Sequence, residues 1–215
     1  MDALVLAETL AARLCHDLSG ELSALTGAME LLREEAAADP EALELASDAG
    51  LALTRRLRLA RAAWGRTGGP MAIDEWRCLA EGLARRGVEL HLDGVSGRSS
   101  FAAEAARLTL NVLLLAVEAL PAGGVVEATG EAHRDIIVRI QGPRAAWPEG
   151  LATMLAEPEA AMARLRSRDA GQAARTLQAP LTALIAHATG QRVSLLFGAR
   201  PEIAPPLLLN LLPLA

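Results

Sequence analysis

Apolar residues recur at alternating spacings of four and three along the first third of the chain. Such spacing places side chains on one face of a helix and is typical of helices that pack in pairs. The first set is Ala11, Cys15, Leu18, Leu22, Leu25, Met29 and Leu32, and the second is Leu43, Ala46, Gly50, Leu53, Leu57, Ala60 and Trp64. The pattern therefore predicts two long helices, each with a continuous apolar seam.

The two predicted helices are joined by a short polar segment, residues 33–39. Asp39 can cap the second helix, Pro40 suits its first position, and the glycine-rich residues 65–70 end it. Two helices so joined form an antiparallel hairpin, in which each helix has only one neighbour for a long seam. We expect a second copy of the chain to complete a four-helix bundle. The alternative is that the second half of the chain covers the seams.

From residue 71 onward the pattern changes to short alternating runs and separate helical segments. The predicted strands are residues 88–92, 125–129, 135–141, 192–197 and 207–211, and the predicted helices are residues 74–86, 101–120, 149–156, 159–168 and 170–189, with Pro180 starting the last portion of the final helix. Mixed strands and helices favour a sheet covered by helices on one face. The predicted fold class is therefore α+β. We expect residues 1–66 to form the N-terminal antiparallel helical hairpin of a dimeric four-helix bundle, and residues 71–215 to form a C-terminal α/β sandwich.

Composition narrows the possible functions. The 215 residues are 52% hydrophobic and 2% aromatic, and the net charge of −5 argues against nucleic acid as a partner. Asp2 and Arg13 do not fit a signal peptide, and no apolar run is as long as a membrane span. Cys15 and Cys78 are too few for a disulfide framework. We expect a cytoplasmic protein that does not act at a membrane.

The predicted chemistry centres on His16 in the first helix. Cys15 and Leu18 belong to the seam, so His16 and Asp17 are expected to face outward. One helical face leads from His16 past three small residues, Gly20, Ser23 and Gly27, which would let another protein approach the imidazole. A neutral imidazole is nucleophilic near pH 7, and Asp17 could orient the ring. The spacing of the histidines and cysteines predicts no metal site in this chain.

With these residues the chain resembles the ChpT-type histidine phosphotransferases of alphaproteobacteria. The resemblance rests on Cys15-His16-Asp17-Leu18, on the segments 28–32 and 110–124, and more weakly on residues 141–144. It implies a histidine-kinase-like architecture with a degenerate ATP-binding domain. It also implies relay of a phosphoryl group from the receiver domain of a hybrid histidine kinase to response regulators. Glu21 stands where relatives commonly have a proline, which predicts a straighter first helix.

An ATP-dependent histidine kinase is the competing enzyme. Laid on the kinase pattern, Leu115 takes the place of the Mg²⁺-binding asparagine. Ile140 and Arg144 replace the aspartate and the second glycine of the adenine-binding turn. Residues 176–181 lack the glycines that would cradle phosphates at a helix start. We therefore expect no ATP and no cofactor in this chain, with Mg²⁺ supplied by the partner receiver domain.

The sequence thus predicts a homodimeric phosphotransfer protein. His16 would exchange a phosphoryl group with receiver aspartates, Asp17 would orient the ring, and Gly20, Ser23 and Gly27 would admit the partner. A non-catalytic dimeric scaffold that binds receiver domains remains a third interpretation, because it predicts the same fold and the same groove.

Overall fold

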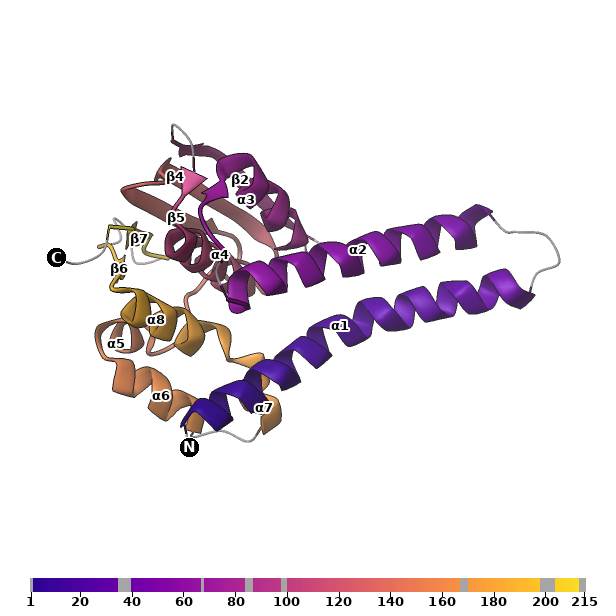
Figure 1. Ribbon diagram of the computed structural model, residues 1–215, viewed down its shortest axis with the longest axis horizontal. Coiled ribbons are helices and arrows are strands. Elements are labelled where there is room, and N and C mark those ends of the chain that lie inside the picture. Colours follow the sequence, from indigo (N-terminus) through magenta and orange to yellow (C-terminus); the bar gives the residue numbers. More distant parts are fainter. Residues whose placement is uncertain are drawn as a thin grey trace.

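The computed structural model describes residues 2–34, 40–66, 68–83, 87–97, 100–166, 170–197 and 204–212. Two long helices form a hairpin at the start of the chain, and a sheet with several shorter helices follows (Figure 1). The mixed α+β class with N-terminal helices and a C-terminal sheet is as predicted. Among the described residues no helix is both long and apolar enough to span a membrane.

The hairpin consists of α1 (Asp2–Glu34) and α2 (Pro40–Trp64). Alanine and leucine, both strong helix formers, dominate the two segments. Small buried residues line the contact between the helices, chiefly Ala28 of α1 with Ala42, Ala46 and Ala49 of α2. The two predicted helices are confirmed, whereas the predicted cap Asp39 lies outside the described residues.

The predicted seams coincide with this contact only in part, because Ala46 belongs to both but most members of the seams lie outside it. Of their members, Leu18, Leu25, Leu32 and Leu53 are half-buried, whereas Ala11, Cys15, Leu22, Met29, Leu43 and Leu57 are exposed. The prediction that Cys15 is buried in a seam is therefore wrong for the single chain. The reason is that the small alanine side chains bring the helices together along an adjoining face. The larger apolar residues are left outside.

Five strands form the main sheet, in the order β2-β4-β5-β7-β6. They are β2 (Val88–Ser96), β4 (Gly124–Glu131), β5 (Asp135–Gln141), β6 (Arg192–Leu195) and β7 (Leu207–Asn210). β2 and β4 are parallel, and the other neighbours are antiparallel. All five strands were predicted. A small second sheet of β1 (Met71–Ala72) and β3 (Ser100–Phe101) was not, because two-residue strands leave no alternation to detect.

Helices pack against the sheet and between it and the hairpin. They are α3 (Ile73–Ala80), α4 (Ala103–Glu118), α5 (Leu151–Ala156), α6 (Pro158–Arg166), α7 (Ala170–Arg175) and α8 (Gln178–Thr189), with a 3₁₀ turn η1 (Glu81–Leu83). Phe101 lies in β3 and not in the predicted helix. The helix expected over 170–189 is broken at Thr176, and Pro180 lies in the first turn of α8, where its missing N–H costs no helical hydrogen bond.

The base of the hairpin is attached to the rest of the chain. Asn111 of α4 is fully buried, and its Nδ2 donates to the carbonyl of Ala63, 2.7 Å away near the end of α2. Gln178 Nε2 of α8 donates to Asn111 Oδ1 at 3.0 Å. The first half of α1 runs along α6 and α7, and the distal half of the hairpin extends away from the sheet (Figure 1). This attachment sets the position of α1 beside α4 and α7.

Candidate functional site

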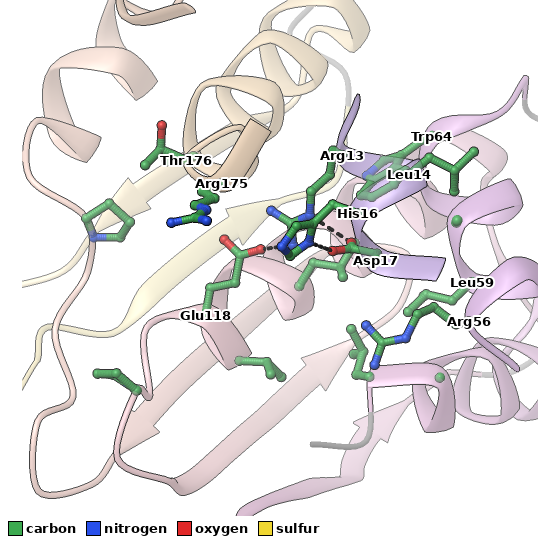
Figure 2. Close-up of a pocket in the computed structure, with 18 residues that line it drawn as sticks. Arg13, Leu14, His16, Asp17, Arg56, Leu59, Trp64, Glu118, Arg175 and Thr176 are labelled. Atoms are coloured by element: carbon green, nitrogen blue, oxygen red, sulfur yellow. Dashed lines mark hydrogen bonds and ion pairs between the residues drawn. The ribbon is translucent and has the colours of Figure 1, made fainter. Parts of the chain in front are cut away.

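His16 lies on the outer surface of α1, as predicted from its place beside the seam. Its side chain is 64% exposed, and its Nδ1 is 3.3 Å from Oδ1 of Asp17. Figure 2 shows the imidazole and the Asp17 carboxylate side by side, with Arg13 behind them. The ring is therefore open to solvent on one side and in contact with a carboxylate on the other.

Asp17 does not face outward as expected. Only 14% of its side chain is exposed, and its Oδ2 accepts a hydrogen bond from Arg13 Nε at 2.7 Å. Consecutive helical residues point about 100° apart, so the step from His16 to Asp17 turns the carboxylate toward α4 and α7. The structure thus brings His16 and Asp17 together but gives them different surroundings.

Arg13 connects the histidine-bearing helix to the C-terminal part of the chain. Its Nη2 is 2.5 Å from Oε1 of Glu118 at the end of α4, and its Nη1 donates to the carbonyl of Ala174 at 3.3 Å. Burial lowers the pKa of the Arg13 guanidinium, but Glu118 and Asp17 together raise that pKa above its ordinary value. Arg13 therefore remains a cation with two carboxylate partners.

A cavity of about 560 Å³ opens beside these residues, between the hairpin and the C-terminal part (Figure 2). His16 and Asp17 line it from α1, Arg56 and Trp64 from α2, and Glu118 and Arg175 from α4 and α7. Arg56 Nη2 lies 3.8 Å from Oε1 of Glu21, which links the two hairpin helices. Helix α1 continues through Glu21 without interruption, in line with the absence of a proline there.

The three small residues lie along α1 beyond His16. Gly20 and Ser23 are exposed, and Gly27 is half-buried. A Cβ atom added to either glycine would meet nothing within 4 Å. Packing within this chain does not require glycine at these two positions, so the surface beside the imidazole is open.

Sequence reasoning missed Arg13 and Glu118 as parts of the site. The i,i+4 spacing of Arg13 and Asp17 was a detectable signal, because residues four apart are neighbours on a helix. Glu118 is 105 residues from Arg13 in the chain, and no local pattern could bring the two together.

Two of the positions laid on the kinase motifs belong to the core, whereas Arg144 is exposed. Leu115 of α4 and Ile140 of β5 are both 1% exposed and packed among apolar side chains. Neither has a side-chain oxygen that could hold Mg²⁺ or an adenine amino group. Within the described part of the chain, no group of three or more His, Cys, Asp and Glu is arranged to hold a metal ion.

Together, the fold and the site define a protein with a surface histidine on a helical hairpin, packed against an α/β part. The family model for the histidine phosphotransferase C-terminal domain matches residues 73–199. The chain belongs to this histidine phosphotransferase family.

Three known proteins show how far the similarity reaches. Protein phosphotransferase ChpT of Brucella abortus (strain 2308) is 30% identical over 128 residues, which are 58% of this chain and 60% of that protein. A solved structure described as a bacterial phosphotransferase has a TM-score of 0.71 at 24% identity, over 98% of this chain and 97% of that one, and shows the same fold. The histidine kinase domain of a blue-light activated kinase from Erythrobacter litoralis EL346 gives a TM-score of 0.40 at 14% identity, over 92% and 93%.

Proposed function

We propose that His16 accepts a phosphoryl group from the aspartyl phosphate of a receiver domain and passes it to the aspartate of another. One observation carries the proposal: an exposed imidazole contacts an Asp17 carboxylate in a chain of the histidine phosphotransferase family. The donor is the receiver domain of a hybrid histidine kinase, and the acceptors are response regulators.

The contact with Asp17 selects the attacking nitrogen. A carboxylate accepts hydrogen bonds and donates none, so the proton between the two groups belongs to Nδ1. Nε2 then carries the lone pair and attacks phosphorus. The Nε2–P bond forms as the bond from phosphorus to the aspartyl oxygen breaks, and the receiver aspartate leaves as a carboxylate. Asp17 offsets the positive charge that develops on the ring, and the reverse step uses the same groups.

The receiver domain supplies the Mg²⁺ for this reaction, and the chain itself uses neither ATP nor another cofactor. The buried apolar side chains of Leu115 and Ile140 support this proposal, because ATP-dependent phosphorylation would need polar groups at those places. The same residues make the alternative of an ATP-dependent kinase the weaker one.

The partner is proposed to approach along α1 from His16 toward the distal end. Gly20, Ser23 and Gly27 leave backbone close to the surface there, and neither glycine has a neighbour where a Cβ would lie. In-line transfer needs the phosphorus atom near Nε2, so small residues beside the ring favour the reaction by removing steric obstacles.

We also propose that the protein is a homodimer with a four-helix bundle. Leu22 (54% exposed) and Met29 (49%) of α1, with Leu43 (57%) and Leu57 (44%) of α2, present apolar surface outside the hairpin contact. A row of large apolar side chains at heptad spacing is unfavourable in water and favours burial against a second hairpin.

The test is transfer of label. A set of receiver domains from the source organism is phosphorylated with acetyl [³²P]phosphate, freed of the donor and mixed with the protein. We expect label on the wild type and none on His16→Ala. His133→Ala is the matched control, because His133 is also exposed (60%) and lies 3.3 Å from a carboxylate, that of Glu131.

If a receiver binds the wild type but no receiver transfers label to it, the relay is contradicted and the protein is a non-catalytic scaffold. Labelling by ATP alone would restore the kinase alternative.

A further inference from the structure

Arg13 is a mostly buried cation shared by carboxylates from two separate parts of the chain. Its side chain is 12% exposed, and the partner side chains of Asp17 and Glu118 are 14% and 25% exposed. In Figure 2 the Glu118 and Asp17 carboxylates lie on opposite sides of Arg13, beside the His16 ring. The function proposed for His16 assigns no task to this cluster beyond the contact of Asp17 with the ring.

We propose that Arg13 is a positioning residue for phosphotransfer: it holds the Asp17 carboxylate against Nδ1 of His16, and Glu118 of α4 in turn holds Arg13. The proposal rests on the function proposed for His16. It makes the C-terminal part of the chain a component of the transfer site, since the site is incomplete without Glu118.

The geometry of the guanidinium carries the argument. Each of its three nitrogens has a different partner: Nε the Asp17 carboxylate at 2.7 Å, Nη1 the Ala174 carbonyl at 3.3 Å and Nη2 the Glu118 carboxylate at 2.5 Å. A guanidinium is planar and rigid, so three partners set its position and its orientation. Asp17 receives its shorter hydrogen bond from Arg13, whereas its contact with the exposed His16 ring is 3.3 Å long. Arg13 therefore determines where the Asp17 carboxylate lies, and the exposed His16 ring orients toward that carboxylate.

A nearby cation also stabilises the Glu118 carboxylate. Glu118 is the last residue of α4, and a carboxylate at the C-terminal end of a helix is close to the negative end of the helix dipole. The Arg13 guanidinium offsets that repulsion. Substitution of Arg13 therefore removes the support from two carboxylates at once, on α1 and on α4.

A second arginine pair offers a control within the same molecule. Arg166 of α6 binds Asp2 at the start of α1, so it also joins α1 to the C-terminal part. The side chains of Arg166 and Asp2 are both about half exposed. Asp2 lies on the same helix as His16, fourteen positions away. If transfer depended only on tying α1 to the C-terminal part, loss of either pair would slow transfer, and the exposed pair would slow it less. A positioning role predicts no slowing when Arg166 is replaced.

The first experiment measures the single-turnover rate of transfer from a labelled receiver to His16 at saturating receiver. We expect Arg13→Gln to slow transfer by about 10- to 100-fold, the scale for loss of a charge-assisted hydrogen bond. Glu118→Gln should slow transfer less. Arg13→Lys should give an intermediate rate, because lysine keeps the positive charge but lacks the planar guanidinium with its several donors. Arg166→Gln should stay within about twofold of the wild-type rate. The receiver concentration at half-maximal rate stays unchanged in all four.

A double-mutant cycle then separates positioning from support of the fold. If Arg13 acts through Asp17, Arg13→Gln adds little to the effect of Asp17→Asn. An equal effect of Arg13→Gln with and without Asp17, or equal effects of Arg13→Gln and Arg166→Gln, would overturn the proposal.

One readout does not depend on transfer. In protein with ¹⁵N-labelled histidine, the His16 ring nitrogens, assigned with His16→Gln, report which one carries the proton. We expect the Nδ1–H form to dominate in the wild type and to lose population in Arg13→Gln. If the two proteins have the same population of the Nδ1–H form, the proposed role of Arg13 is overturned even where transfer is observed. If the population falls in Arg13→Gln but the wild type accepts no label, only the relay proposed for His16 is contradicted.

Discussion

The two ends of the helical hairpin differ in what covers their apolar residues. At the base, α2 packs against the C-terminal part through Leu59 (3% exposed) and Ala63 (0%). Toward the distal end, Leu22 (54%) and Leu43 (57%) face solvent in the single chain. The same helices carry both regions, with similar leucine content. Burial within the chain therefore accounts for the base, whereas at the distal end the buried residues that the structure describes are small alanines, and the large apolar side chains would be buried only in the proposed dimer. His16 lies between the two regions.

The largest expected effect is loss of the dimer when the distal surface is made polar. Leu22→Glu with Met29→Glu places four charges in the proposed interface of two chains. Full burial of a large apolar side chain contributes about 1.5–3 kcal/mol, and these side chains are about half exposed before association. Loss of four of them should therefore weaken association by about 3–6 kcal/mol, and sedimentation equilibrium should show a monomer.

The control for this variant is Ala24→Glu. Ala24 is exposed on the same stretch of α1, about 200° around the helix from Leu22, and should leave the dimer intact. A wild-type monomer at every concentration would contradict the proposed dimer outright.

A pair of neighbouring leucines sharpens the same comparison. Leu59 is buried in the core, and Leu57, two residues earlier in α2, is 44% exposed. Leu59→Ala should lower the free energy of unfolding by about 2–5 kcal/mol at every protein concentration, because it leaves a cavity. Leu57→Ala should act on the dimer, so its effect measured by urea denaturation should change with protein concentration. The two leucines lie at the same end of the hairpin on different faces of α2, so equal, concentration-independent losses would show that the face carrying Leu57 is not in a dimer interface.

The hydrogen-bonded attachment at the base has a smaller expected effect. Asn111→Ala removes two buried hydrogen bonds, one to the Ala63 carbonyl and one from the Gln178 amide. The Ala63 carbonyl keeps Arg107 Nε at 3.3 Å, and Gln178 Nε2 keeps the backbone carbonyl of residue 111 at 2.9 Å. We therefore expect a loss of about 1–3 kcal/mol in all, which chemical denaturation should record. Asn210→Ala, which removes a 2.6 Å hydrogen bond to Asp135 from a half-buried position, is the control and should cost less. A larger loss for Asn210 would contradict the importance of the attachment.

The same comparison explains what could be predicted from the sequence. Ile136, Val138 and Ile140 recur at every second position in a run rich in β-branched residues, which is a local signal, and it gave the observed bounds of β5. The hairpin followed from heptad spacing, which is also local. The face that α2 presents to α1 did not, because alanines and leucines both satisfy the apolar pattern and only three-dimensional packing chooses between them.

The candidate site divides in the same way. The exposure of His16 followed from its place next to the apolar positions, and the prediction held. The inward direction of Asp17 did not follow, because it depends on Glu118 and Ala174, which are far away in the sequence. Ion pairs between residues far apart in the chain produce no periodic pattern in the sequence. For this reason the roles of Arg13 and Glu118 could not be predicted.

The smallest expected change in stability concerns Gly20, at the boundary between the two regions. Glycine inside a helix costs about 1 kcal/mol relative to alanine, and a Cβ at this position meets nothing within 4 Å. Gly20→Ala should therefore raise the free energy of unfolding by up to about 1 kcal/mol, as measured by thermal or urea denaturation.

Transfer to His16 should slow in the same variant, because the added methyl group stands where the receiver is proposed to approach. Gly50→Ala in α2 is the matched control: it is also a helical glycine with nothing within 4 Å of an added Cβ, but it is not on the His16 face. The control should gain stability without slowing transfer. If Gly20→Ala gains stability and transfers at the wild-type rate, the receiver does not approach over this residue, and the small side chains beside the histidine need another explanation.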